Sequence, residues 1–120
     1  MSIQQNLLKF TRGDTEVAEL TLDDDAVFVP GDILFFTVKR KIIDADADAL
    51  IALDSSGAQI EFTPGESTAR VTVLPADTID YRRTVQGVYD WQLDRNGQIV
   101  TLERGVCWIV QDVTRRVASA

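Results

Sequence analysis

The sequence predicts an all-β fold, an antiparallel sandwich of about seven or eight short strands. Short runs of alternating apolar and polar residues recur about every ten residues, and turn-forming Gly, Pro, Asn and Asp separate them. No long stretch has the apolar spacing of an amphipathic helix, which argues against a βαβ fold. The length of 120 residues predicts one domain over residues 1–120, with short extended termini.

The clearest element is a hairpin over residues 87–102. Tyr89, Trp91 and Leu93 alternate with polar residues, and Asn96-Gly97 has the residue types of a two-residue type I′ turn. Alternation places one apolar and one polar face on such a strand. We therefore expect the rest of the core to pack on this hairpin.

The remaining elements follow from turn signals and alternation. The other expected strands are residues 7–10, 17–22, 33–40, 50–53, 59–63, 69–74 and 106–113. Residues 33–40 are apolar on both faces at first, as in a central strand. Pro75 predicts a single helical turn over residues 75–78, with Asp77 or Thr78 as its cap. Gly105 is expected to break the run after the hairpin.

Gly87-Val88-Tyr89 precedes Trp91 in the manner of a tyrosine corner. In that feature of immunoglobulin-like sandwiches, the tyrosine hydroxyl bonds to backbone upstream. A tyrosine that simply belongs to the core fits the same residues equally well. The pattern predicts an immunoglobulin-like sandwich.

The charge balance excludes several classes of partner. With 19 acidic and 12 basic residues the net charge is −7, and such a field repels phosphate backbones and anionic lipid surfaces. We expect neither nucleic acid nor membrane as a partner. The single Cys107 excludes an internal disulfide and is expected to be buried. No secretory or membrane-spanning segment is recognisable, so synthesis in the cytosol is expected.

No pair of residues has the types and spacing that a catalytic site requires. The sequence contains no His, so neither a Ser-His-Asp nor a Cys-His arrangement can form. Asp90 and Asp94 share a strand face, but they lie roughly 13 Å apart, too far for a glycosidase pair. The sequence therefore predicts a non-enzymatic protein with no cofactor and no resident metal.

Three acidic or charged motifs have a functional and a structural interpretation. Asp44, Asp46 and Asp48 have the first spacings of a calcium loop, but the Gly and the closing Glu of that loop are missing. A solvated acidic loop is favoured there and over residues 23–25. Arg12-Gly13-Asp14 matches a cell-adhesion tripeptide, although a local turn explains it better.

Six short motifs occur in a familiar order along the chain. They are Phe10-Thr11-Arg12-Gly13-Asp14-Thr15, Phe36-Thr37-Val38-Lys39, Pro75-Ala76-Asp77-Thr78, Gly87-Val88-Tyr89-Asp90-Trp91-Gln92-Leu93, Thr101-Leu102-Glu103-Arg104-Gly105 and Asp112-Val113-Thr114-Arg115. Together they resemble the small immunoglobulin-like domains of tailed bacteriophages, and are similar to the N-terminal domain of baseplate upper proteins, which anchors receptor-binding proteins. The resemblance covers nearly the whole chain.

The resemblance implies a virion structural protein, an adaptor or decoration component of a tail, baseplate or fibre, made in the bacterial host cytoplasm. It implies that other phage virion proteins and further copies of this chain are the partners. Because the chain stops after one domain, a head-decoration role is an alternative. The expected interface residues are Phe28, Leu50, Ile51, Leu53, Arg115 and Arg116, and the extended termini could add strands to a neighbour.

A carbohydrate-binding sandwich is the alternative from another class. In that hypothesis Trp91 or Trp108 stacks on a sugar, with calcium as a possible aid. Both tryptophans lie in apolar strands, where burial is the usual outcome.

Overall fold

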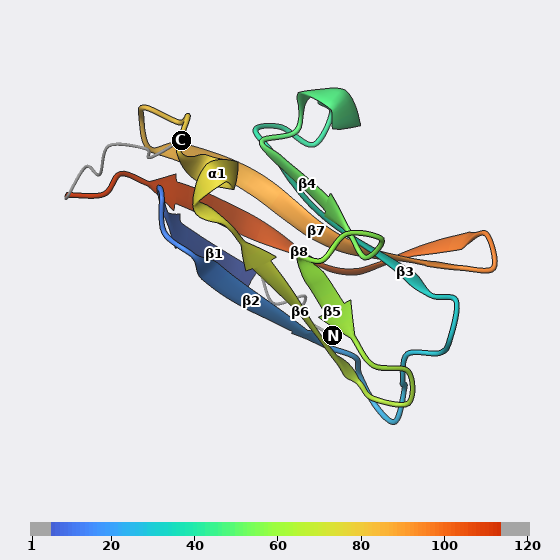
Figure 1. Cartoon of the computed structure of the whole chain (residues 1–120). Coiled ribbons are helices and arrows are strands. Elements are labelled where there is room, and N and C mark those ends of the chain that lie inside the picture. Colours follow the sequence, from blue (N-terminus) through green and yellow to red (C-terminus); the bar gives the residue numbers. More distant parts are fainter. Residues whose placement is uncertain (1–5, 114–120) are drawn as a thin grey trace.

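The computed structural model describes residues 6–113, which form a two-layered β-sandwich (Figure 1). The strands are β1 (Asn6–Thr11), β2 (Glu16–Thr21), β3 (Ile33–Lys39), β4 (Ile51–Asp54), β5 (Ile60–Phe62), β6 (Thr68–Val73), β7 (Val85–Arg95) and β8 (Gln98–Val110). Two short helical segments accompany them, the 3-10 turn η1 (Asp46–Asp48) and the helix α1 (Pro75–Thr78). The predicted all-β class and strand number are confirmed.

The strand order is that of an immunoglobulin-like domain. The large sheet has the order β1-β8-β7-β3-β4 and the small sheet the order β2-β6-β5. Immunoglobulin domains place their second, fifth and fourth strands in one sheet and their third, sixth and seventh in the other, and variable-type domains add a strand beside the third. Here β2, β6 and β5 form the first group, β3, β7 and β8 the second, and β4 is the added strand.

One strand pair departs from the expected antiparallel pairing. β1 runs parallel to β8, whereas β7–β8, β3–β7 and β3–β4 are antiparallel. After β1 the chain turns at Gly13, which has φ +77°, and enters the small sheet as β2. Because β1 is not joined to β8 by a hairpin, connectivity does not impose an antiparallel direction on this pair.

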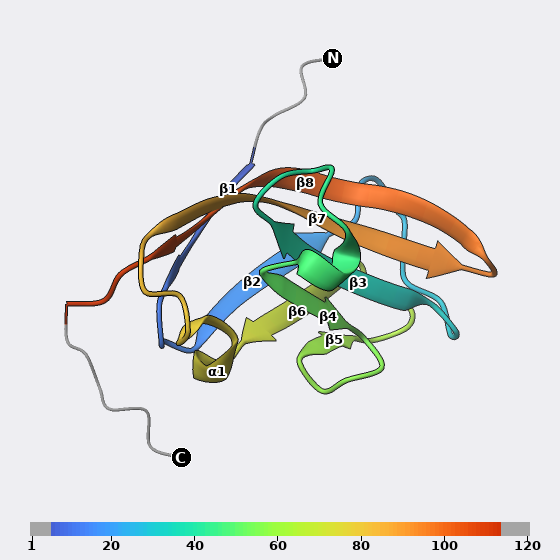
Figure 2. The ribbon, with the colours of Figure 1, turned by 90° about the horizontal axis from the view of Figure 1, so that it is seen from above.

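The expected hairpin is confirmed, and its turn has the predicted chemistry. Asn96 and Gly97 have φ of 54° and 85°, as a type I′ turn requires. The Asp94 carboxylate accepts a hydrogen bond of 3.0 Å from the Gly97 N–H. The hairpin arches across the molecule and its tip projects at one end (Figure 2).

The prediction that Gly105 breaks the run was wrong, because β8 continues through it to Val110. The irregularity is a bulge nearby, where Trp91 pairs with Glu103 but Gln92 pairs with Thr101. Glycine is needed at 105 for close packing. A Cβ there would lie 2.2 Å from the Asn6 backbone oxygen and 2.9 Å from the Tyr89 ring.

The core lies between the two sheets and is rich in aromatic rings. The Phe36 ring centroid lies 5.0 Å from that of Trp91 and 5.8 Å from that of Tyr89. A second aromatic pair, Phe28 and Phe62, has centroids 5.1 Å apart. Strand alternation explains this layer, since every second side chain of each strand points toward the opposite sheet.

The tyrosine-corner interpretation was wrong, and the core interpretation of Tyr89 is confirmed. Tyr89 is buried, and its hydroxyl donates a 2.8 Å hydrogen bond to the Glu103 carboxylate on the neighbouring strand, not to upstream backbone. Burial and the Glu103 carboxylate both raise the pKa of this hydroxyl. Tyr89 therefore joins two strands of one sheet.

Helix α1 forms as predicted, and its two polar residues have different roles. The Asp77 carboxylate accepts a 2.8 Å hydrogen bond from the Leu74 N–H at the start of the helix. Thr78 is fully buried, and its hydroxyl accepts a 2.8 Å hydrogen bond from the Gly13 N–H. Thr78 thus fixes the turn between β1 and β2.

Candidate functional site

The expected interface anchor Phe28 belongs to the core. Its side chain is fully buried and packs on Phe62, and its backbone N–H bonds to Glu66 O at 2.8 Å. The flanking Val27 and Val29 made this stretch resemble an exposed loop, but the loop folds inward at Phe28. The prediction of a partner contact through this ring was wrong, because no surface of the ring is exposed.

The expected contacts from residues 50–53 are also corrected. Leu50 and Ile51 are buried in the core, and Leu53 is half-buried against it. The side chains of Ile51 and Leu53 point inward, so burial leaves Ile51 no surface for a partner and Leu53 only part of one. β4 is nevertheless an edge strand of the large sheet. Arg115, Arg116 and residues 2–5 of the N-terminal arm lie outside the described residues.

The two tryptophans differ in accessibility. Trp91 is fully buried, which excludes it from stacking on a sugar. Trp108 is half-buried on the side of the large sheet that faces away from the core, in register with Lys9 and Gln86. We call this side the outer face.

The adhesion-like tripeptide is held in a structural contact. The Arg12 guanidinium pairs with the Asp112 carboxylate at 3.1 Å, and only 12% of the Arg12 side chain is exposed. The Gly13 N–H bonds to Thr78. These contacts join the β1–β2 turn to α1 and to the residues that follow β8, so the tripeptide is not displayed for a receptor.

The acidic spacing at residues 44–48 does not form an ion-binding loop. Asp46 is paired with Lys39 at 2.6 Å, and the Asp44 carboxylate accepts a hydrogen bond from the Lys41 N–H. Asp46 and Asp48 lie in η1. Within residues 6–113, no group of three or more acidic or Cys side chains could hold a metal ion.

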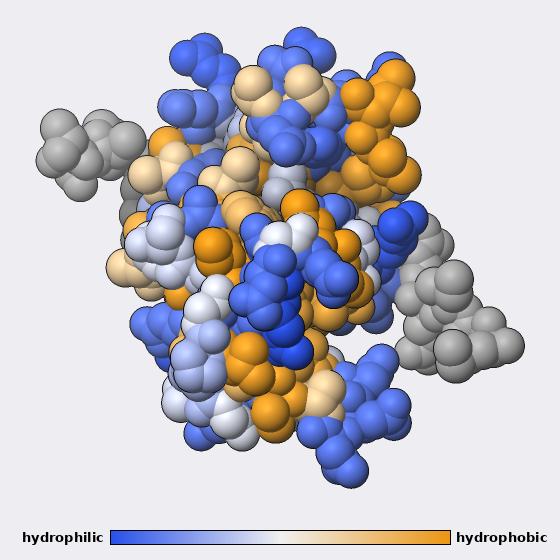
Figure 3. Space-filling view, turned by 90° about the vertical axis from the view of Figure 1, so that its right-hand side faces the viewer, coloured by the Kyte–Doolittle hydropathy of each residue, from blue (hydrophilic) through white to orange (hydrophobic). Residues whose placement is uncertain are grey.

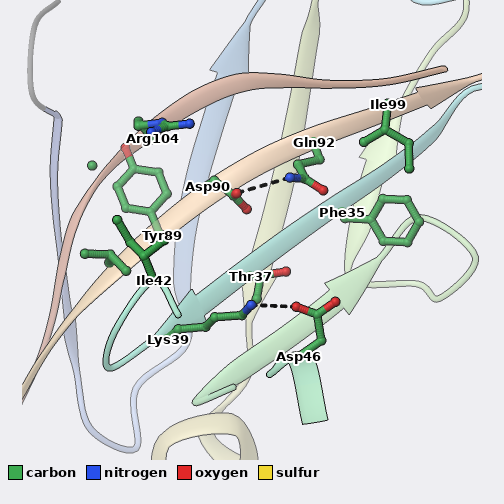
Figure 4. A pocket seen from close by; sticks show the side chains of 12 residues that line it. Phe35, Thr37, Lys39, Ile42, Asp46, Tyr89, Asp90, Gln92, Ile99 and Arg104 are labelled. Atoms are coloured by element: carbon green, nitrogen blue, oxygen red, sulfur yellow. Dashed lines mark hydrogen bonds and ion pairs between the residues drawn. The ribbon is translucent and has the colours of Figure 1, made fainter. Parts of the chain in front are cut away.

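The candidate site is a pocket of about 600 Å³ on the outer face of the large sheet (Figure 4). We call it the outer-face pocket. The lining residues come from β3, β7, β8 and the segment after β3: Phe35, Thr37, Lys39, Ile42, Asp46, Val88, Tyr89, Asp90, Gln92, Ile99, Arg104 and Gly105. Its volume lies within the ~300–1,000 Å³ range of small-ligand sites.

Strand register builds the floor of this pocket as two rows. Thr37, Asp90 and Arg104 stand opposite one another on β3, β7 and β8. In the next row Phe35 stands opposite Gln92, which is paired with Thr101. Residues in register on one face lie within side-chain contact range, so each row presents a continuous surface.

The segment after β3 forms one wall. The Lys39 ammonium, 19% exposed as a side chain, reaches the Asp46 carboxylate at 2.6 Å and ties η1 to the sheet. Ile42, on the same segment, is 71% exposed at the rim. Figure 4 shows Ile42 and Arg104 toward one end of the pocket, with Ile99 and Phe35 toward the other.

Asp90 is the electrostatic centre of the pocket. Burial raises the pKa of its carboxyl, while the charges of Lys39 and Arg104 act in the opposite direction and that of Asp46 adds to the rise. The Asp90 carboxylate accepts one long hydrogen bond, 3.4 Å from the Gln92 side-chain amide. Asp90 is therefore a partly desolvated acceptor.

A second polar cluster holds the hairpin in place. Asp32, whose side chain has no exposed surface, accepts two hydrogen bonds from Arg95, at 2.9 and 2.8 Å, and one from the Val29 N–H. The hydrogen bond from Arg95 lowers the pKa of Asp32 most, against the effect of burial. This bidentate pair fastens the end of β7 to the loop before β3.

The chemistry of these groups fits binding. Burial raises the pKa of the Cys107 thiol to about 12, so the thiolate is not available as a nucleophile near neutral pH. The sequence has no His. The outer-face pocket offers a carboxylate, cations and an amide beside apolar walls, a combination that recognises a ligand.

Sequence reasoning missed the outer-face pocket, although one signal for it was present. Residues 33–40 are apolar on both faces, and only one face can point into the core of a sandwich. Phe35 is the half-buried ring on the second face. An aromatic residue at an outward position was thus the available indication of a binding surface.

No family model and no curated protein matches this chain. Among solved structures, the chain is similar to the extracellular domain of the voltage-gated sodium channel beta4 subunit, with 12% sequence identity and a TM-score of 0.42. The match covers 94% of this chain and 98% of that chain. That domain forms parallel homodimers that explain a role in cell-cell adhesion. A likeness at this level carries no argument about function here.

No helix within residues 6–113 is long and apolar enough to cross a membrane.

Proposed function

We propose that this chain is a protein-interaction module of a bacteriophage virion, an adaptor or decoration component of a tail, baseplate or fibre. The observation that carries the interaction role is the outer face of the large sheet. Large apolar side chains are exposed on it and around its rim: Leu7, Ile33, Ile42 and Ile99. Exposed apolar surface rimmed by polar groups is typical of interaction sites.

Edge strands offer a second mode of contact. β1 and β4 are the edges of the large sheet, and β2 and β5 are the edges of the small one. Unpaired backbone groups at such edges can accept a strand from another copy or from a neighbouring virion protein. This supports self-association and protein partners as part of the proposal.

The virion part of the proposal has its support in the sequence. Five of the six short motifs that resemble phage immunoglobulin-like domains fall on the strands, the turns and helix α1 of this fold, and the sixth begins after β8 and extends past the described residues. Gly13 occupies the turn after β1, and Phe36 and Trp91 form the core. In this proposal the protein is made in the bacterial cytoplasm and resides in the particle.

Mass spectrometry of purified particles tests the proposal. Trypsin releases the peptide 84–95, because Arg83 precedes it and Arg95 ends it. We expect this peptide at a fixed ratio to the major virion proteins. If the protein is abundant in the lysate and absent from particles, the virion role is rejected. Separate measurement of heads and tails distinguishes the tail role from the head-decoration alternative.

A matched pair of variants tests which face makes the contact. Ile99→Ser removes an apolar side chain, 63% exposed, beside the outer-face pocket, and Val17→Ser removes one, 53% exposed, from the small sheet. We expect Ile99→Ser to lower incorporation into particles and Val17→Ser to leave it unchanged. Equal incorporation of both variants would exclude the large sheet as the contact face.

A further inference from the structure

The outer-face pocket combines opposite charges in equal number. Lys39 and Arg104 are its cations, and Asp46 and Asp90 are its carboxylates. These formal charges cancel, so the pocket as a whole attracts neither a cation nor an anion strongly. It does hold separate hydrogen-bond donors and acceptors at close quarters, which is what a neutral polar ligand requires.

The two members that face a ligand are Asp90 and Arg104. Lys39 is already bound to Asp46 at 2.6 Å, so this pair is satisfied within the wall. The ion pairs found within residues 6–113 include neither Asp90 nor Arg104, although the two stand opposite each other in the strand register. A group that donates to the one and accepts from the other would satisfy both.

Asp90 is the stronger indication of the two. It is half-buried, and its carboxylate accepts a hydrogen bond of 3.4 Å from the Gln92 side-chain amide. The same amide lies 3.4 Å from the Thr101 hydroxyl. A partly desolvated carboxylate with one long hydrogen bond gains from a further donor, because a charged acceptor makes the stronger kind of hydrogen bond.

Apolar groups lie directly beside these polar ones. The half-buried Phe35 is the register partner of Gln92, so the two side chains are neighbours on the outer face. Ile42 and Ile99 are 71% and 63% exposed at opposite rims. Figure 4 shows Thr37, Asp90 and Gln92 between Ile42 at one end and Ile99 and Phe35 at the other. The ligand therefore has one polar edge and one apolar face.

We propose that the outer-face pocket binds a short neutral saccharide. Hydroxyls on adjacent carbons donate to the Asp90 carboxylate and accept from the Arg104 guanidinium, while the C–H face of the ring packs on Phe35. This site differs from the tryptophan platform that the sequence suggested, and it needs no metal ion. It goes beyond the proposed virion role and does not depend on it.

An NMR titration of the full chain, labelled with ¹⁵N, tests the proposal. The probes are maltose, N-acetylglucosamine and methyl α-mannoside, added up to about 50 mM because sites with few contacts bind in the millimolar range. We expect at least one probe to shift the amide signals of Thr37, Asp90 and Gln92 in a saturable way. Absence of a saturable shift with all three probes overturns the proposal.

Asp90→Asn and Arg104→Gln are the decisive variants. Asp90→Asn keeps the side-chain size and Arg104→Gln shortens the side chain, and each removes the charge that a hydroxyl contacts, so we expect affinity to fall about tenfold or more. Asp24→Asn and Arg82→Gln are the matched controls, since they make the same charge changes at exposed loop positions outside the pocket. Asp24 has φ 56°, a conformation that Asn tolerates. Equal loss in variants and controls would overturn the assignment.

Charged probes separate the remaining ligand classes. Arginine amide carries a positive charge, and glycine betaine carries both charges without hydroxyls. We expect neither to shift the pocket signals at the concentrations at which the saccharide does. If either binds more tightly than every saccharide, the pocket recognises that charge pattern and the saccharide proposal is rejected. The particle measurement above is independent of all these outcomes.

Discussion

The outer faces of the two sheets arise from the same alternation but differ in what they present. On the small sheet, Arg70 stands in register with Glu19 and Glu61, and its guanidinium pairs with Glu61 at 3.2 Å. Both side chains of that pair are more than half exposed. On the large sheet, Asp90 and Arg104 are in register without forming an ion pair, beside a half-buried Phe35.

The difference follows from what surrounds each face. The outer face of the small sheet is open to water, so its charges are solvated and its ion pair contributes little stability. On the large sheet, the segment that carries η1 forms a wall, and the β7–β8 hairpin extends the face. Figure 3 views the molecule from the end at which this hairpin projects, and hydrophobic residues are exposed there among hydrophilic ones. Because these elements partly bury Asp90, its carboxylate is less solvated than an ordinary outward-facing strand residue and is better placed to bind a ligand.

Phe28→Ala gives the largest expected effect. The two sheets differ on their outer faces, but both bury apolar side chains on their inner faces, and Phe28 belongs to that shared core. Phe28 is fully buried, so its truncation leaves a cavity and lowers the free energy of unfolding by about 3–5 kcal/mol. Denaturant unfolding followed by tryptophan fluorescence measures this. Ile43→Ala, at a position 90% exposed, is the control and should change stability by less than about 0.5 kcal/mol. A folded, equally stable Phe28→Ala protein would restore the anchor hypothesis.

Gly105→Ala is expected to separate β1 from the large sheet. The added methyl group meets the Asn6 oxygen at 2.2 Å, and relief requires β1 to move. We expect a loss of about 1–3 kcal/mol and faster amide hydrogen exchange in β1 than in β2. Gly57→Ala is the control, because its nearest contact would be an ordinary 3.7 Å. Unchanged exchange in β1 would show that the sheet accommodates the methyl group.

Asp32→Asn weakens the paired hydrogen bonds between Asp32 and Arg95, which hold the β7–β8 hairpin against the loop before β3. Since the folded pKa of Asp32 is lowered, its stabilisation is present above the unfolded value of about 3.9 and is lost as pH falls through the folded pKa. We expect Asp32→Asn to lower stability at pH 7 by about 1–2 kcal/mol, because Arg95 is partly exposed and the pair is screened. The difference in stability between the two proteins should shrink as the pH falls below about 3.9, and unfolding curves at a series of pH values measure it.

Asp90→Asn should give the smallest effect, with the opposite sign. The folded pKa of Asp90 is raised, so between about 3.9 and that raised value the folded state binds more protons and stability falls as pH rises. We expect Asp90→Asn to increase stability at pH 7 by less than about 1 kcal/mol. Glu61→Gln on the small sheet should leave stability unchanged or lower it slightly, since it removes an exposed pair.

The same titration by NMR checks the carboxyl groups directly. The Asp90 carboxyl should titrate above the usual aspartate range and the Asp32 carboxyl below it. If the pKa of Asp90 equals that of an exposed aspartate, the carboxyl is not partly buried in solution. The outer faces of the two sheets would then not differ in the solvation of their charged groups.

Local rules in the sequence determined the fold class, the hairpin and the turns. Asn96 and Gly97 tolerate the positive φ that a two-residue type I′ turn requires. The alternation of Tyr89, Trp91 and Leu93 assigns each side chain to one face. Pro75 likewise specified the start of α1. These features depend on neighbours along the chain, so they can be predicted before the sheets are assembled.

The tertiary structure alone decided the direction of β1, the continuity of β8 through Gly105 and the burial of Phe28. It also placed Thr37, Asp90 and Arg104 in one row. Each of these depends on which strand lies beside which, and alternation gives the face of a side chain but not its neighbour in the sheet. The sequence placed Phe28, Leu50 and Ile51 at an interface for the same reason, because the local pattern of an apolar residue near turn signals is identical whether the segment faces water or folds back onto the core.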